Sequence, residues 1–244
     1  MDLARVSIGL PGATPHDVIE TLASQIEAAG FRGLWLNDTP GGDSLAGLSV
    51  AARVTSTLHL GTGVIPLDRR SATGILSALG KLPTDRLSLG IGVGSAKHGL
   101  ELIRISVQEL RAATTASIIV GALGPKMRAL GASIADGLLF NWLTPAAAAE
   151  AMAELEPPVR GVLYARTALS RDALPALRVE AARYGSYPSY AANFTRIGAT
   201  PIDTTIQDIA GIEEYAGIVD ELVLRVITRE PTLDEYQRFL DTVK

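Results

Sequence analysis

The sequence contains no cysteine, and this absence removes several chemistries at once. Disulfides, thiol nucleophiles, thiolate metal sites and iron–sulfur clusters all need a cysteine on the chain. Histidine is also scarce, with three residues. Carboxylates and histidines at the ends of the apolar runs are too few for a metal centre, so we expect no metal site.

Long apolar runs and a strong excess of one charge are missing as well. No apolar stretch approaches the roughly 20 residues that span a bilayer, and the opening MDLARVSIGL shows no export signal. The net charge is −4, with acidic and basic residues interspersed. This argues against nucleic-acid or membrane-surface binding, and we expect a cytoplasmic protein.

The sequence does contain a repeated alternation of short apolar runs with alanine-rich amphipathic stretches. Most of the runs are continuously apolar, as expected of strands buried on both faces of a parallel sheet. The runs are ARVSIGL (4–10), GLWLN (33–37), LHLGTGVI (58–65), RLSLGIGV (86–93), SIIVGA (117–122), GLLFN (137–141), RGVLYA (160–165) and DELVLRVI (220–227).

The stretches between these runs are expected to be helices with recognisable ends. The first should begin with Thr14 as its N-cap and Pro15 as its first residue, and end at Gly30. The last should begin at about Thr232, with Glu235 three residues later. Eight such βα units predict a (β/α)8 TIM barrel, a single domain over residues 1–244, with an open doubly wound sheet as the alternative.

Three glycine clusters follow the third, fourth and fifth runs: GTGVIP (61–66), GIGVGSAK (90–97) and GALGPK (121–126). None fits the dinucleotide-binding or P-loop pattern. In a barrel they would lie at the C-terminal ends of neighbouring strands, where barrel enzymes place their active sites. The glycines either turn the chain or let its backbone approach a flat or anionic ligand.

Four segments carry a resemblance to a known family. They are AAGFRGLWLND (28–38), LHLGTGVIPLDRRSA (58–72), RLSLGIGVGSA (86–96) and IIVGALGPKMRALGASIADGLLFNWLTP (118–145). The chain resembles the bacterial-luciferase-like flavin- or F420-dependent oxidoreductases, a superfamily of (β/α)8 barrels. The resemblance implies an oxidoreductase or monooxygenase that uses F420 or FMN for hydride transfer to, or monooxygenation of, a small organic substrate. Nothing in the sequence separates the two cofactors, and a homodimer is possible.

The resemblance also implies cofactor-binding residues on the second, third and fourth strands. A non-prolyl cis peptide in the third strand would fall near Gly63–Val64 and support the back of the cofactor ring. Asn37 and Asp38, at the tip of the second strand, would line the cavity. Ser95, after the fourth strand, would bond the ring or its ribityl chain.

The cofactor phosphate would lie further along the chain. Leu123 and Gly124 would offer backbone N–H groups to it, with Asn141 beside them. Arg69 and Arg70 follow the third strand and either bind a phosphate or the carboxylate tail of F420, or form a solvated surface pair.

Two residues are candidates for acid–base catalysis. Asp38 ends the second strand inside the expected mouth, or alternatively caps the following loop. His98 follows the fourth strand and could donate a proton, or be a surface residue at a helix start.

One departure from the family pattern leaves a second function open. The interval GSAKHGLELIRISVQELRAATT (94–115) holds little more than one helix, where family members commonly carry lid insertions. The alternative is therefore a non-catalytic barrel with a reduced lid that binds flavin or F420. An unrelated barrel acting on phosphosugars would need a general base near Gly121–Gly124, and only the distant Asp38 and His98 are available.

Overall fold

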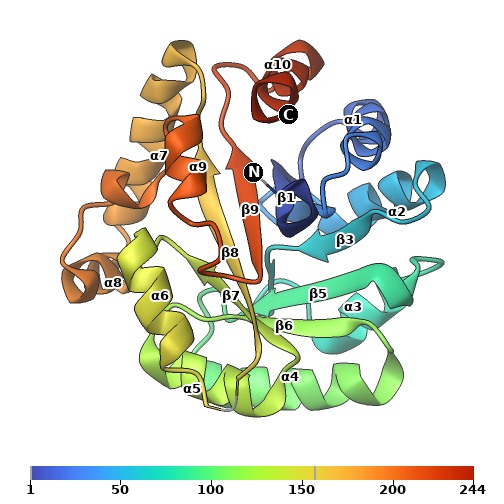
Figure 1. Cartoon of the computed structure of the whole chain (residues 1–244). Helices are drawn as coiled ribbons and strands as arrows, with labels where there is room; N and C mark the ends of the chain where they lie inside the picture. Colours follow the sequence, from blue (N-terminus) through green and yellow to red (C-terminus); the bar gives the residue numbers. More distant parts are fainter. Residues whose placement is uncertain (1, 157) are drawn as a thin grey trace.

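The protein forms a closed parallel barrel surrounded by helices, as a computed structural model of residues 2–156 and 158–244 shows (Figure 1). The hydrogen-bonded order is β3-β2-β1-β9-β8-β7-β6-β5-β4, and a β3–β5 pairing closes the ring. The strands are β1 (Val6–Pro11), β2 (Gly33–Asn37), β3 (His59–Thr62), β4 (Ile65–Pro66), β5 (Leu87–Gly92), β6 (Ser117–Gly121), β7 (Gly137–Asn141), β8 (Arg160–Thr167) and β9 (Glu221–Val226).

The short strands β3 and β4 are two parts of one barrel strand, so the predicted (β/α)8 barrel is confirmed and the open sheet is wrong. Helices follow the strands along the chain (Figure 1). They are α1 (His16–Ala28), α2 (Ser44–Val54), α3 (Ala72–Ala78), α4 (Gly99–Ala113), α5 (Pro125–Ile134), α6 (Pro145–Ala153), α7 (Leu174–Gly185), α8 (Pro188–Ile197), α9 (Ile209–Glu213) and α10 (Leu233–Val243).

The helix ends agree with the sequence in part. Thr232 caps α10 by accepting a hydrogen bond from the Glu235 N–H, as predicted. The prediction for Thr14 is wrong: α1 begins at His16, so Pro15 occupies the cap position and Thr14 is buried. Gly30 lies just beyond the C-cap with a φ of 82°, the left-handed conformation that glycine adopts without strain.

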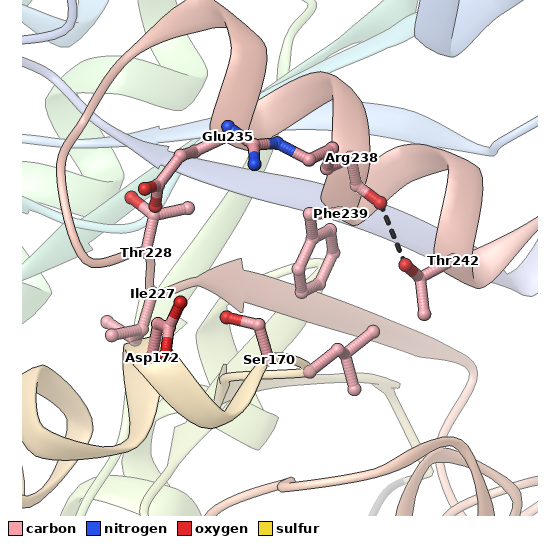
Figure 2. Close-up of a pocket in the computed structure, with 9 residues that line it drawn as sticks. Ser170, Asp172, Ile227, Thr228, Glu235, Arg238, Phe239 and Thr242 are labelled. Carbon is pink, nitrogen blue, oxygen red and sulfur yellow. Dashed lines mark hydrogen bonds between the residues drawn. The ribbon is translucent and has the colours of Figure 1, made fainter.

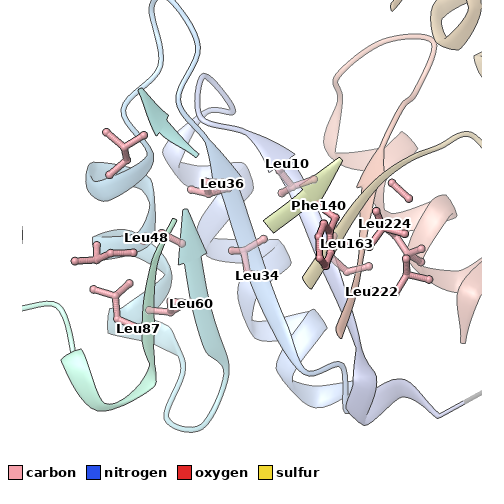
Figure 3. Close-up of a cluster of buried hydrophobic side chains, with 14 of the residues drawn as sticks. Leu10, Leu34, Leu36, Leu48, Leu60, Leu87, Phe140, Leu163, Leu222 and Leu224 are labelled. Atoms are coloured by element: carbon pink, nitrogen blue, oxygen red, sulfur yellow. The ribbon is translucent and has the colours of Figure 1, made fainter. Parts of the chain in front are cut away.

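The main hydrophobic core lies between the outer face of the barrel and the helices (Figure 3). Leu34 and Leu36 of β2 and Leu48 of α2 are all completely buried in it. The strand sequences are apolar on both faces because the inner face also packs, around Trp35, Leu139 and Tyr164. This double burial explains the continuous apolar runs.

The N-terminal end of the barrel is closed by a buried carboxylate. Glu221 accepts hydrogen bonds from Trp35 Nε1 at 2.7 Å and from Ser7 Oγ at 2.5 Å, and it pairs with Arg32 and Arg160. Burial by itself would raise the pKa of Glu221, but Arg160, the Ser7 hydroxyl and Arg32 lower it overall. The N-terminal end of the barrel is thus filled by these side chains, and the candidate site lies at the C-terminal ends of the strands.

His59 lies at this closed end as well, where its Nε2 is 2.8 Å from Ser88 Oγ. Burial lowers the pKa of His59 to about 4, so the ring is neutral near neutral pH. In the described ranges, every helix is too short or too polar to cross a membrane.

Candidate functional site

The mouth of the barrel is formed by the last inward-facing residue of each strand. Inward positions alternate along the strands, as the interior cluster around Trp35 and Tyr164 shows. This alternation places one residue from each barrel strand at the rim. They are Pro11, Asn37, Gly63, Gly92, Gly121, Asn141, Arg166 and Arg225.

One side of this rim is made of glycines packed around Val64. A β-carbon added to Gly92 would lie 2.7 Å from Val64 Cγ2, and one added to Gly121 would lie 3.0 Å from Val64 Cγ1. Gly63 and Val64 are only half-buried, so solvent reaches them. The peptide bond between them is cis, at the position where the resemblance implies one.

Asn37 and Asp38 end β2 beside this glycine side. Asn37 Oδ1 is buried and has no hydrogen-bond partner among the described residues. Asp38 Oδ1 instead accepts a hydrogen bond of 2.6 Å from the backbone N–H of Ser44 at the start of α2. Asp38 thus caps the loop that it precedes, while Asn37 has an oxygen free for a ligand.

The two arginines after the third barrel strand are held by the protein itself. Arg69 Nη2 donates a hydrogen bond of 2.7 Å to the carbonyl oxygen of Asp38. Arg70 pairs with both carboxylate oxygens of Asp43, at 3.1 Å and 2.8 Å. The hydrogen bond from Arg70 lowers the pKa of Asp43. The Arg70 side chain is therefore bound to Asp43, at the start of α2.

The residues that follow β5 lie on an exposed turn. The Ser95 N–H donates a hydrogen bond of 2.7 Å to Asp68 Oδ2, and Gly94 has a φ of 65° against the same carboxylate. The hydroxyl of Ser95 remains exposed. His98 is also exposed, at the N-cap of α4 with a left-handed φ of 57°, and it makes no side-chain capping bond.

The turn from β6 into α5 carries the predicted phosphate-binding groups. Gly124 is the N-cap of α5, with no atom within 4 Å of a β-carbon built on it, and Pro125 is the first residue of the helix. Arg196 of α8 donates a hydrogen bond of 2.9 Å to the carbonyl of Leu123. A helix N-terminus beside a guanidinium favours an anion.

Behind this turn lies a second arginine, on α5. Arg128 is buried over the ring of Phe140, and its Nε has no partner in the described chain. Burial lowers the pKa of Arg128, and the nearby charge of Arg196 lowers it further. Arg196 and Arg128 therefore both contribute positive potential around the turn.

Asn141 is held at the rim by a residue that the sequence analysis missed. Its Oδ1 accepts a hydrogen bond from Arg166 of β8. The Arg166 guanidinium lies against two rings that also contact each other, with its Cζ 4.3 Å from the Trp142 centroid and 4.6 Å from that of Tyr184. Its Nε also pairs with Glu180 of α7 at 3.1 Å. The alternation of inward-facing and outward-facing residues along β8 could have indicated this position, because Arg166 lies two residues after the inward-facing Tyr164.

A tyrosine beneath the rim was also missed. Tyr164 is fully buried, and its hydroxyl has no partner among the described residues. A β-carbon on Gly9 would lie 2.8 Å from this hydroxyl, and one on Gly63 would lie 2.8 Å from the ring. Burial raises the pKa of Tyr164 to about 12, so it remains a proton-bearing donor.

The predicted residues thus fall into two groups. Asn37, Gly63, Val64, Leu123, Gly124 and Asn141 are half-buried at the strand ends around the mouth. Asp38 and Arg70 are engaged in the loops beyond, and Arg69, Ser95 and His98 are exposed there. Within residues 2–156 and 158–244, no three His, Asp or Glu side chains are grouped to hold a metal ion.

Two cavities of the described chain lie outside the mouth. One, of about 110 Å³, lies between α10 and the segment after β8, and Figure 2 shows Phe239 between Ser170 and Arg238 there. The other is lined by residues of α8 and the segment 198–203. Between β5 and β6 the described chain carries the single helix α4, with no further helix or strand over the mouth in this interval.

Comparison with known proteins gives a family match and a set of similar folds. Residues 2–114 match the family described as luciferase-like monooxygenase. A search of curated protein sequences gives no significant match.

Among solved structures, the coenzyme F420-dependent tetrahydromethanopterin reductase from Methanopyrus kandleri has a TM-score of 0.73 at 16% identity, covering 94% of this chain and 96% of that one. An F420-dependent secondary alcohol dehydrogenase, in complex with an F420–acetone adduct, has a TM-score of 0.72 at 12% identity, covering 98% and 99%. The oxygenating constituent of 3,6-diketocamphane monooxygenase from Pseudomonas putida, in complex with FMN, has a TM-score of 0.68 at 10% identity, covering 97% and 96%.

At these identities the structural neighbours establish the fold alone, and the family match covers residues 2–114, a little under half of the chain. The predicted resemblance to the bacterial-luciferase-like superfamily is therefore confirmed, by the family match over residues 2–114 and by a fold shared over nearly the whole chain.

Proposed function

We propose that this protein binds a flavin-type cofactor, F420 or FMN, in the barrel mouth and acts as a two-electron oxidoreductase on a small organic substrate. The cofactor would supply hydride transfer or, in the case of FMN, oxygen activation. The observation that carries the proposal is the glycine side of the rim, where the backbone of Gly92 and Gly121 packs directly against the half-buried Val64.

The residues of the mouth fit such a group in two ways. The glycines let the half-buried Val64 pack directly on the rim, where its side chain can contact a flat ring, because a β-carbon on Gly92 would displace it. Asn37 Oδ1 and the Tyr164 hydroxyl are buried polar atoms without a partner in the described chain. Such atoms cost free energy unless a ligand or water satisfies them, so a polar ring edge is a suitable partner.

The phosphate of the cofactor would be held at the β6–α5 turn. The Leu123 and Gly124 N–H groups stand at the start of a helix, and Arg196 and Arg128 add positive potential. Arg196 also donates a hydrogen bond to Asn193 Oδ1, and Asn193 donates one of 3.0 Å to the Trp142 carbonyl. Helix α8 thereby connects the β6–α5 turn to Trp142, the residue that follows Asn141 at the rim.

The residues of the mouth would bind and orient the cofactor and donate hydrogen bonds to it. Asn141 is oriented by Arg166, Val64 supports one face of the mouth, and Tyr164 keeps its proton at neutral pH. Asp38 and His98 remain proposed acid–base residues. His98 is the more available of the two, because it is exposed, whereas Asp38 accepts a bond from Ser44.

A barrel that binds the cofactor without turning it over is the second candidate. The single helix α4 between β5 and β6 favours it, because little of the chain in this interval is left to cover a substrate. A loaded protein whose bound cofactor is neither reduced nor reoxidised by alcohols, aldehydes, ketones or oxygen would support this reading over the first.

The proposed phosphate site is tested by comparing the affinity for FMN with that for riboflavin, which lacks the phosphate. FMN should bind at least about tenfold more tightly than riboflavin, since a charge-assisted phosphate contact contributes on the order of 1.4 kcal/mol or more. Arg196→Gln should narrow this ratio, whereas Arg178→Gln, an exposed arginine on α7, should leave it unchanged. Equal affinity for FMN and riboflavin in all three proteins would contradict the proposed phosphate site.

A further inference from the structure

The strands across the barrel from the glycines carry arginine at their last inward-facing positions. Arg166 of β8 and Arg225 of β9 are paired in the register of these strands. They follow Tyr164 and Val223, which face the interior, by two positions. Counting β3 and β4 as one strand, β9 is four steps from β5 in either direction around the ring. Arg225 therefore lies on the side of the mouth opposite Gly92.

The two arginines differ in how their charge is balanced. Arg166 is neutralised by Glu180 at 3.1 Å and lies against the rings of Trp142 and Tyr184. Among the described residues, the Arg225 guanidinium donates a hydrogen bond only to the carbonyl oxygen of the next residue, Val226. Within the described ranges it has no carboxylate partner at salt-bridge distance.

The other titratable groups that influence this layer do not supply a second negative charge. Tyr164 and Tyr236 both sense the charge of Arg225, and burial raises the pKa of each, so both phenols are neutral at neutral pH. Burial alone would raise the pKa of Glu180, but Arg166 and Arg225 lower it overall, so this carboxylate is ionised. Two guanidinium groups and one carboxylate leave one positive charge without a counter-ion.

From this arrangement we infer that the substrate is an organic anion and that Arg225 binds its anionic head group, a carboxylate or a sulfonate. A half-buried guanidinium with unused donors is suited to bidentate contact with a planar carboxylate. An anion anchored at Arg225 would place the rest of the substrate toward the glycine side of the mouth. The inference rests on the proposed function, which places the cofactor on the glycine side of the mouth.

The phosphate of the proposed cofactor is not the anion in question. The Leu123–Gly124 turn follows β6, and β6 is separated from β9 by β7 and β8. That turn also has its own basic residues, Arg196 and Arg128. The mouth thus carries two separate sites of positive potential, and the one on β9 is available to the substrate.

The test uses pentanoate, pentanesulfonate and the uncharged pentanamide as probes, at constant ionic strength. They are titrated into the apoprotein and into protein mixed with FMN or F420, by calorimetry and by following the side-chain Nε–H resonance of Arg225. Wild type should bind the two anions and not the amide. Arg225→Gln should weaken pentanoate binding about tenfold or more, and Arg225→Lys should retain part of it.

Arg229→Gln is the matched control, because Arg229 is exposed just beyond β9 and pairs with Glu230 and Glu235. It should bind pentanoate as wild type does. Binding that is unchanged in Arg225→Gln, equal for pentanamide, or absent in folded wild type would overturn the inference. If Arg225→Gln does not fold, Arg225→Lys and the Nε–H resonance decide.

The two proposals fail in different ways in this experiment. Pentanoate binding at Arg225 by a protein that takes up neither FMN nor F420 would contradict the proposed function and leave the anion site standing. Cofactor binding without pentanoate binding would contradict only the anion site. An Arg225→Gln variant that loses F420 affinity but keeps pentanoate binding would likewise overturn the assignment of Arg225 to the substrate.

Discussion

A β-carbon on Gly92 would lie 2.7 Å from Cγ2 of Val64, so the Val64 side chain already fills the space that a larger residue at position 92 would need. Real β-carbons do not approach another atom this closely, so Gly92→Ala must displace Val64. Since Val64 is half-buried at the mouth, the displacement is directed into the proposed cofactor site.

We therefore predict that Gly92→Ala weakens FMN or F420 binding about tenfold, because overpacking costs typically 1–3 kcal/mol. Fluorescence or absorbance titration measures the dissociation constant. Gly211→Ala in α9 is the control, since its added β-carbon would make only ordinary contacts at 3.5 Å. A Gly92→Ala protein with wild-type affinity would show that Val64 does not contact the cofactor.

The closed end of the barrel should depend on the charge of Glu221. Glu221→Gln leaves Arg32 and Arg160 beside a neutral amide, and breaking a buried ion pair costs about 3–5 kcal/mol. Urea unfolding should show this loss. Glu101→Gln on α4 removes an exposed pair at 3.7 Å with Arg104 and should cost less than about 1 kcal/mol. Equal losses in the two variants would contradict the assigned role of Glu221.

His59 should make the protein less stable in mild acid. Its folded pKa is lowered to about 4, below the value of about 6.5 for an unfolded histidine. Between these values the unfolded chain binds the extra proton, so stability falls as the pH drops from about 6.5 to about 4, by on the order of 3 kcal/mol.

His59→Gln removes this titration and should flatten the curve of unfolding free energy against pH in that window. Urea midpoints measured at a series of pH values provide the comparison. A variant that loses stability as steeply as wild type between pH 6.5 and pH 4 would assign the loss to other groups.

Arg166 and Glu180 should behave as a coupled pair. Arg166→Met leaves Glu180 largely buried without its main partner and frees Asn141. We expect each single variant to be destabilised and the double variant, with Glu180→Met, to lose less than the sum, with a coupling of about 1–3 kcal/mol. Strict additivity in a double-mutant cycle would mean that the pair contributes nothing as a unit.

The barrel was predictable because its strands are buried on both faces. The runs at 33–37 and 137–141 coincide with β2 and β7, and the run at 58–65 contains β3 together with the cis peptide of Gly63–Val64. Local rules served less well at the ends of elements. Thr14 has the chemistry of an N-cap but stands one residue too early, because α1 starts at His16.

The candidate site was predictable only where the backbone defines it. Leu123 and Gly124 lie in the short turn between β6 and α5, so their place at the mouth depends on the fold alone. Side-chain partners come from distant segments: Arg70 pairs with Asp43, and Arg166 lies against the rings of Trp142 and Tyr184. Such partners depend on tertiary packing, and for this reason sequence spacing did not reveal them.

The central claim is that this mouth takes up one flavin-type cofactor. The most direct measurement is native mass spectrometry of the apoprotein mixed with FMN and with F420, combined with difference absorbance. The account predicts a mass increase of one cofactor per chain with at least one of the two, and a perturbed ring absorbance that saturates at the same stoichiometry. A folded protein that shows neither with either cofactor would contradict it.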